Sequence, residues 1–299
     1  MNGGNHGNHW AALAAAIFLV GAAEAQPYAD AVLDLDPVGY WRLDETGGTT
    51  AWDASGRGLH GTYHGRVAMG RPGALSTADA AAGFAGGCVQ IPHDDRFRCD
   101  SGTLTFWCRA AGGATNGGLV SKDAAGFGAG GHLTLRNNEN GYLYVHLQSA
   151  EAEYLVTAPH PIAADRWYYI AFTFGAGGMT LHVDGDLIDS NPYTGGLAGN
   201  REPLVLGANT WASAPGGTAP LCDPYLGLLD EVALFDRALT REQIHGLYQA
   251  AATPEPATAA LLAAAGAAGA GRRMKKRAHP RMGRTRRVSR RTSTSSASS

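Results

Sequence analysis

The chain has 299 residues but only four cysteines, and no two of them are spaced as C-x-x-C. This argues against a zinc ribbon or a thioredoxin-type redox site. The sequence also lacks the motifs G-x-S-x-G and H-E-x-x-H and a phosphate-binding loop. The glycine-rich residues 126–131 are not followed by Lys-Ser/Thr, so they predict a flexible loop and no nucleotide site.

Basic side chains are scarce in the body of the chain. Residues 26–252 carry 13 Lys and Arg against 24 Asp and Glu, a net charge of −11. Residues 253–299 carry 11 Lys and Arg against one Glu, a net charge of +10. The acidic body argues against nucleic-acid binding, which needs a positive face. A basic tail is typical of a targeting or interaction segment.

The first nine residues contain no Lys or Arg, but an apolar run follows from Trp10 to Ala23. Small residues at −3 and −1 predict signal cleavage after Ala25, with a buried helix as the alternative. Export would permit disulfides. Four cysteines allow three pairings, which the sequence does not separate: Cys88, Cys99, Cys108 and Cys222. For Cys108, in a strand candidate, a buried free thiol is the alternative.

Residues 166–190, RWYYIAFTFGAGGMTLHVDGDLIDS, carry the strongest structural signal. Both faces of an extended chain over residues 167–174 are apolar or aromatic, as in a strand buried within a two-layer β structure. Glycines within 175–178 predict a turn. Residues 179–183 predict the returning strand, and Asp184-Gly185 predicts a second tight turn. Two successive hairpins are therefore expected at the centre of the fold.

Short strand candidates recur along the rest of the chain, and their regular spacing favours a sandwich over a βαβ fold. A long glycine-rich loop is expected over 44–65, and a capping box at residues 240–243 begins one short helix. We expect the apolar stripe of this helix to dock at the sandwich edge. The strand candidates are 38–43, 88–91, 103–109, 118–122, 132–136, 142–148, 154–157, 204–207 and 225–235.

Five segments, in this order, resemble the laminin-G-like (concanavalin A-like) jelly roll. They are GYWRLDETGGTTAWDASGRGLHGTY, GTLTFWCRA, the ribbon W-x-x-I-A-F-T-F with L-H-V-D-G-D-L-I, LVLGAN, and LGLLDEVALFDRALTREQI. The resemblance spans residues 28–250. It implies an all-β fold, an antiparallel two-sheet jelly-roll sandwich with one short C-terminal helix. Modules of this family bind sugars, proteins, calcium or no known ligand.

The C-terminal segment resembles the bacterial PEP-CTERM sorting signal. Pro-Glu-Pro is followed by an apolar span over 257–271 and an arginine and lysine cluster. The resemblance implies that Pro254, Glu255 and Pro256 are recognised by an exosortase-like membrane peptidase that processes the tail. The span is shorter than the roughly 20 residues that cross a bilayer, and residues 272–299 continue well past the first arginines. A disordered basic Ser/Arg tail is the alternative.

The carboxylates do not form the pattern of a sugar hydrolase. Laminarinase-type relatives carry E-x-D-x-x-E on one strand, which places the acids on one face. The nearest segments here are residues 184–189 and 229–232, and neither matches. Asp230 and Glu231 are adjacent and should point to opposite faces of a strand. We therefore predict a protein without catalytic residues.

Calcium is the metal that the resemblance suggests, since loops supply the oxygen ligands of hard cations. It implies Asp53 in the first long loop and Asp230 near the last strand as structural ligands. The alternative is a calcium-free fold in which Asp230 accepts backbone or arginine hydrogen bonds. His60 and His64 are four apart, but they lie in the predicted loop rather than on a helix, so solvated histidines are expected.

A sugar site on a jelly roll needs an exposed aromatic platform with polar neighbours. Trp52, Tyr193 and Trp211 lie in turn-rich stretches and are the predicted ligand-binding residues. The tryptophans in strand candidates are assigned to the core instead: Trp41, Trp107 and Trp167.

Four segments are expected: a signal peptide (1–25), the jelly-roll domain (26–252), a sorting segment (253–277) and a disordered basic tail (278–299). The predicted protein is exported to the cell surface or extracellular matrix. There it binds an extracellular polysaccharide or another surface protein without catalysis. The alternatives are a glycoside hydrolase or lyase relative and a structural matrix protein with no ligand.

Overall fold

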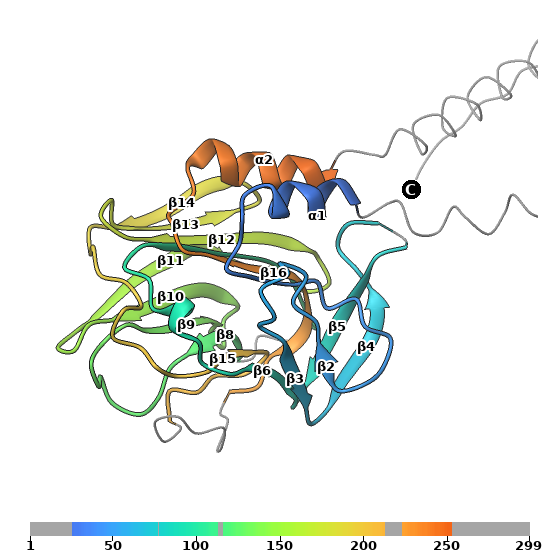
Figure 1. The fold of residues 1–299 in the computed structure, drawn as a ribbon, viewed down its shortest axis with the longest axis horizontal. Coiled ribbons are helices and arrows are strands. Elements are labelled where there is room, and N and C mark those ends of the chain that lie inside the picture. Colours follow the sequence, from blue (N-terminus) through green and yellow to red (C-terminus); the bar gives the residue numbers. More distant parts are fainter. Residues whose placement is uncertain (1–25, 77, 113–115, 213–222, 253–299) are drawn as a thin grey trace, which may run out of the picture. The chain divides into compact units, whose positions relative to one another are not determined.

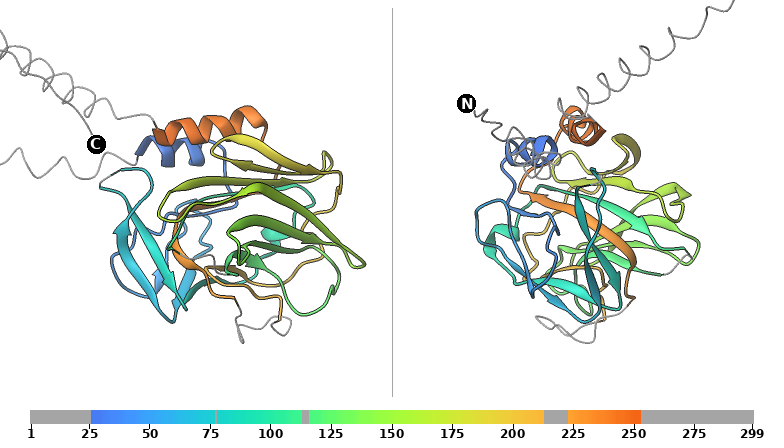
Figure 2. Two further views of the ribbon diagram at one scale, coloured as in Figure 1. Left: turned by 180° about the vertical axis from the view of Figure 1, so that it is seen from behind. Right: turned by 90° about the vertical axis from the view of Figure 1, so that its right-hand side faces the viewer.

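Alternating apolar side chains fold the chain into two antiparallel β-sheets, sheet A and sheet B, which are stacked face to face (Figure 1). The computed structural model describes residues 26–76, 78–112, 116–212 and 223–252. Each sheet has eight strands, and two helices cover the outer face of sheet A (Figures 1 and 2). The predicted all-β sandwich is therefore confirmed.

Strands that are neighbours in a sheet are often distant in the chain. In spatial order, sheet A runs β14 (Asp186–Asn191), β13 (Met179–Val183), β12 (Tyr168–Phe174), β7 (Gly102–Ala110), β16 (Leu226–Phe235), β5 (Ala80–Ala85) and β4 (Val67–Pro72), with β1 (Gly39–Trp41) also paired to β16. Sheet B runs β11 (Glu153–Pro161), β10 (Tyr142–Gln148), β9 (His132–Asn137), β8 (Gly118–Lys122), β15 (Leu204–Leu206), β6 (Cys88–Ile91), β3 (Gly61–His64) and β2 (Thr50–Ala51).

The predicted central ribbon is β12 with β13, and β12 is buried along its whole length between β7 and β13. Ile170 and Phe172 point into the core between the sheets, whereas Tyr169 and Ala171 point to the outer face of sheet A. Asp184, at φ 52°, makes the predicted tight turn, and its carboxylate accepts the Tyr169 amide at 3.0 Å. Burial on both faces explains why this stretch is apolar throughout.

Helix α2 (Arg241–Ala252) begins with the predicted capping box. The Thr240 amide donates to Gln243 Oε1 at 2.9 Å, and the Gln243 amide donates to Thr240 Oγ1 at 3.2 Å. Its buried residues Ile244 and Leu247 pack on the outer face of sheet A. The helix was expected at the sandwich edge. It lies on the face because the outward side chains of the central strands, among them Tyr169, are apolar there.

A second helix, α1 (Gln26–Leu33), lies beside α2 and was not predicted (Figure 1). Tyr28, Ala29 and Val32 are buried, and the Tyr28 ring meets the Tyr169 ring edge-on at 6.5 Å between centroids. The short helix η1 (Asp95–Phe97) is the third helical element of the described residues. None of the helices in this part of the chain is long and apolar enough to cross a bilayer.

A buried lysine fastens the end of β8 to two loops. Lys122 is fully buried, and its ammonium donates to Asn200 Oδ1 at 2.9 Å and to the Glu202 carbonyl. It lies 5.9 Å from the centre of the Phe97 ring. Burial lowers the pKa of Lys122 to about 7, because the charged form loses its water. The loops that carry Phe97 and Asn200 are thus tied to sheet B.

Candidate functional site

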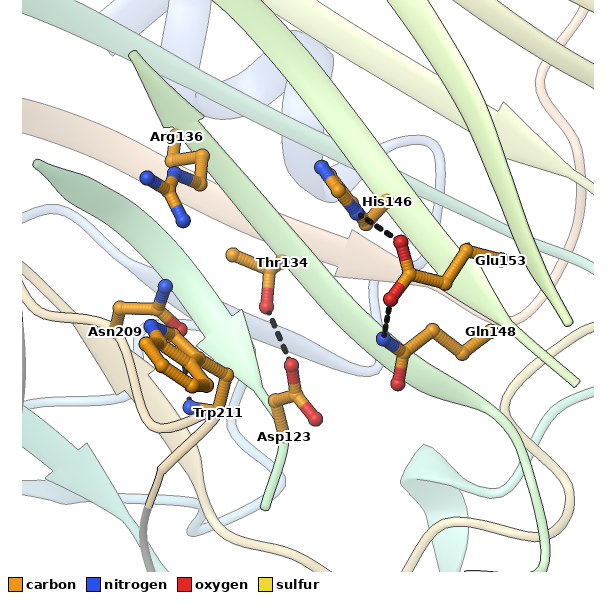
Figure 3. Close-up of a pocket in the computed structure, with 8 residues that line it drawn as sticks. All are labelled: Asp123, Thr134, Arg136, His146, Gln148, Glu153, Asn209 and Trp211. Atoms are coloured by element: carbon orange, nitrogen blue, oxygen red, sulfur yellow. Dashed lines mark hydrogen bonds and ion pairs between the residues drawn. The ribbon is translucent and has the colours of Figure 1, made fainter. Parts of the chain in front are cut away.

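The outer face of sheet B is hollowed over β9 and β10 (Figure 3). Leu133, Leu135 and Leu147 point into the core, so the residues that alternate with them face outward. The hollow has a volume of about 270 Å³, just below the roughly 300–1,000 Å³ of drug-sized ligand sites. Eight residues line it: Asp123, Thr134, Arg136, His146, Gln148, Glu153, Asn209 and Trp211.

Two hydrogen-bond donors hold the carboxylate of Asp123 in the hollow. Thr134 Oγ1 donates to Asp123 Oδ2 at 2.8 Å, and the Ala124 amide donates to Oδ1 at 2.8 Å. His132 Nδ1 lies 2.8 Å from the same Oδ1. These contacts fix the direction of a nearly buried carboxylate, as a site that orients a ligand requires.

Glu153, the first residue of β11, contacts two side chains of β10 in the hollow. Gln148 Nε2 donates to Glu153 Oε1 at 3.2 Å, and His146 Nδ1 lies 3.3 Å from Oε2 (Figure 3). Burial lowers the pKa of His146, although the Glu153 carboxylate acts in the opposite direction. His146 is therefore a neutral ring at pH 7, and it can both donate and accept.

Trp211 is the aromatic residue of the hollow, and half of its surface is exposed (50%). Its Nε1 donates to Asp223 Oδ2 at 3.0 Å, which fixes the ring. Arg136 lies over the Tyr144 ring at 5.3 Å and places Nη1 3.7 Å from the same Asp223 oxygen. Its Nη2 donates to Asn116. The hollow thus combines a fixed aromatic ring with fixed polar groups.

The three predicted ligand-binding aromatics do not lie together. Trp52 is exposed, follows β2 at the opposite end of sheet B from β11, and packs against His60. Tyr193 stacks on Tyr154 with centroids 3.6 Å apart, and both pack against the core between the sheets. Of the three, Trp211 alone lines the described hollow.

A second polar centre gathers the carboxylates of Asp44, Asp79 and Asp230. One oxygen from each lies within 4.8 Å of the other two. Asp230 is fully buried, and its Oδ2 accepts the Ala74 amide at 2.8 Å. Asp79 Oδ1 and Asp230 Oδ1 are buried without a hydrogen-bond partner among the described residues. A group of oxygen ligands in which two buried atoms have no hydrogen-bond donor suits a hard cation, so this triad could hold a metal ion.

One arginine lies within ion-pair distance of this acidic cluster. Arg42 lies 3.0 Å from Asp44, 3.9 Å from Asp79 and 3.1 Å from the buried Glu231. Its single positive charge leaves an excess of carboxylates. Burial raises the pKa of Asp44 to about 6, and it raises the pKa of Asp230 and of Glu231 well above the usual range. A cation or bound protons would offset this charge.

Asp53 is not part of the triad. Its carboxylate accepts the amides of Tyr40, Ser55 and Leu59 at 2.9 to 3.0 Å. These bonds close the loop that follows β2. Of the two aspartates predicted as metal ligands, the described acidic cluster contains Asp230. Asp44 and Asp79 are the members that sequence reasoning did not name.

Cys88, Cys99 and Cys108 are free thiols, and Cys222 lies outside the described residues. Each of the three complete pairings needs one bond among the first three cysteines, so none of these pairings is formed. The predicted sorting residues Pro254, Glu255 and Pro256 also lie outside the described residues.

Solved structures with the same fold are distant in sequence. Domain 4 of AbnA, an extracellular GH43 arabinanase from Geobacillus stearothermophilus in complex with arabinotriose, aligns with a TM-score of 0.56 and 19% identity. The alignment covers 71% of this chain and 98% of that chain. The binding domain of botulinum neurotoxin DC in complex with SialylT aligns with a TM-score of 0.52 and 16% identity, over 73% of this chain and 52% of that chain. At these identities the likeness shows the fold alone.

Comparison with family models assigns the chain to a family. No curated protein matches it. The family model for the concanavalin A-like lectin/glucanases superfamily matches residues 84–245, more than half of the chain. The model for the PEP-CTERM protein-sorting motif matches residues 252–277. The chain therefore belongs to the concanavalin A-like lectin/glucanase superfamily and carries a PEP-CTERM sorting motif.

Proposed function

We propose that the protein is an exported, surface-associated module that binds glycan without cleaving it. The observation that carries this proposal is the exposed Trp211 ring beside oriented polar groups in the hollow of sheet B. A sugar ring has apolar faces and polar edges, which such an arrangement matches. Two proteins that share the fold were solved in complex with arabinotriose and with SialylT.

The sorting motif supports the proposed location. A PEP-CTERM motif implies export and surface sorting, and processing by an exosortase-like membrane peptidase accounts for Pro254, Glu255 and Pro256 as recognition residues. A surface module would meet extracellular polysaccharide or the proteins of neighbouring surfaces. A protein ligand and a purely structural role are the competing outcomes of the binding experiments.

The binding site is tested by Trp211→Ala with Trp52→Ala as the matched control, since both tryptophans are exposed. On a polysaccharide panel, the full-length Trp211→Ala protein should bind at least tenfold more weakly, a loss of about 1.4 kcal/mol. Trp52→Ala should bind as the unchanged protein does. Equal loss in both variants, or binding to none of the polysaccharides, would refute the proposal. Release of reducing ends from β-glucan would favour the hydrolase alternative instead.

We further propose that the triad of Asp44, Asp79 and Asp230 holds a structural calcium ion. Calcium added after EDTA treatment should raise the melting temperature, because a ligand at 100 times its Kd stabilises the folded state by about 2.7 kcal/mol. Asp230→Asn should abolish the rise, whereas Asp186→Asn, an exposed aspartate of β14, should retain it. An unchanged melting temperature with calcium would exclude this site.

A further inference from the structure

The hollow of sheet B carries an excess of negative charge. Asp123 and Glu153 line it, and Asp223 is bonded to its tryptophan. Arg136 is the one lysine or arginine among the lining residues. Counting histidine as neutral, the three carboxylates and the one guanidinium give a net charge of −2. The body around it is also acidic, with a net charge of −11 over residues 26–252.

The guanidinium of Arg136 is already engaged on its outer nitrogens. Nη2 donates to Asn116, and Nη1 faces Asp223 at 3.7 Å. The Tyr144 ring covers one face of the guanidinium, with its centroid 5.3 Å from Cζ of Arg136. A carboxylate or sulfate on a ligand is often bound by two N–H groups of an arginine. The Nε of Arg136 is buried, so an anionic ligand would have to share the two outer nitrogens with Asp223 and Asn116.

The groups that do face the hollow suit hydroxyl ligands. Carboxylates accept hydrogen bonds and donate none, so the half-exposed Glu153 pairs with the O–H donors of a sugar. Asp123 is nearly buried and already bonded, and it contributes mainly negative charge. The Gln148 carbonyl oxygen is a further acceptor next to Glu153. A ligand carboxylate would add a like charge, which the carboxylates of the hollow would repel.

From this placement we propose that the hollow selects polymers of uncharged sugars and rejects uronic-acid and sulfated glycans. The inference rests on the proposed glycan-binding function and names the ligand class for the same site. Two features would give this selectivity. Hydrogen-bond acceptors pair with the hydroxyl groups of a neutral sugar, and carboxylates repel an anionic chain.

The test compares neutral arabinan and β-glucan with polygalacturonate and dextran sulfate, using the full-length protein at low and high salt. The neutral polymers should bind at least about tenfold more tightly than the anionic ones at about 50 mM salt. Added salt should strengthen the residual binding of polygalacturonate, because it screens repulsion, and should leave neutral binding unchanged.

Glu153→Gln keeps the shape of the side chain and removes its charge. It should raise polygalacturonate affinity several-fold and weaken the neutral polymers. Glu139→Gln, in the exposed β9–β10 turn, makes the same change of net charge away from the hollow and should do neither.

Two failures are distinguishable. If neutral polymers bind through Trp211 but polygalacturonate binds as tightly, or weakens with salt, the charge inference alone is overturned. If no polymer binds, or Trp211→Ala changes nothing, the proposed function fails and the inference fails with it.

Discussion

Lys122 makes the free energy of unfolding depend on pH, and a single substitution can measure its contribution. Its folded-state pKa is about 7, below the roughly 10.4 of an unfolded chain. Between these values the unfolded state binds more protons, so this residue makes the protein more stable as the pH rises from 7 to 10. Lys122→Met should remove that rise, by a few kcal/mol at the upper end, since each pKa unit corresponds to about 1.4 kcal/mol.

Denaturant unfolding of both proteins at pH 7, 8.5 and 10 measures this difference. Burial raises the pKa of Cys88 and of Cys99 to about 11, and these thiols act in the opposite direction above pH 8.5. Cys88 is present in both proteins and cancels in the comparison. Cys99 interacts electrostatically with Lys122, so both proteins should carry Cys99→Ala. The hydrogen bond from Lys122 to Asn200 adds an offset that does not vary with pH. Parallel stability curves would contradict the prediction.

The exposure of a side chain could be predicted where the local sequence determines it. Trp52 and Trp211 are exposed, as their turn-rich neighbourhoods suggested. Tyr193 is instead covered by Tyr154, because the two rings come from segments about 40 residues apart that only the fold brings together. Asp79 joins the acidic triad for the same reason. Its loop and β16 meet through strand pairing, which no local spacing signals.

The helix α1 offers a prediction at the scale of an element. Val32 is fully buried in the apolar cluster that α1 and α2 form with sheet A, whereas the neighbouring Leu33 is exposed. Val32→Ala should lower the free energy of unfolding by about 2 kcal/mol, since it removes buried methyl groups and leaves a cavity. Leu33→Ala, in the same helix, should cost less than about 0.5 kcal/mol.

Thermal and denaturant unfolding of the two variants would make the comparison. Equal, small effects would mean that α1 does not belong to the cooperative fold. A large effect of Val32→Ala alone would place the helix in the same cooperative unit as sheet A.

Elements with strong patterning were predicted and the others were not. The hairpin of β12 and β13 was evident because both of its faces are buried and glycines mark its turn. The predicted loop over 44–65 contains β2 and β3, which are two and four residues long and too short for a period to show. The helix α1 has only eight residues, so its apolar side chains give little helical signal. The hollow could not be predicted from the sequence, because its lining residues come from four separate segments of the chain.

At the scale of the whole molecule, the sorting motif predicts the fate of a truncated protein. A chain that ends at Ala252 lacks the residues matched by the PEP-CTERM model beyond that point. It should appear in the medium, because the anchoring segment is gone. Cell fractionation of the full-length and truncated proteins measures the difference, with Glu255→Ala as a variant that retains the basic tail. Unchanged membrane association of the truncated protein would contradict the sorting role.

Helix α2 ends at Ala252 on the outer side of sheet A, and α1 begins at Gln26 in the same layer (Figure 1). The hollow lies on the outer side of sheet B, with the thickness of the sandwich between. The described chain therefore begins and ends on one face of the sandwich, while Trp211 is exposed on the other.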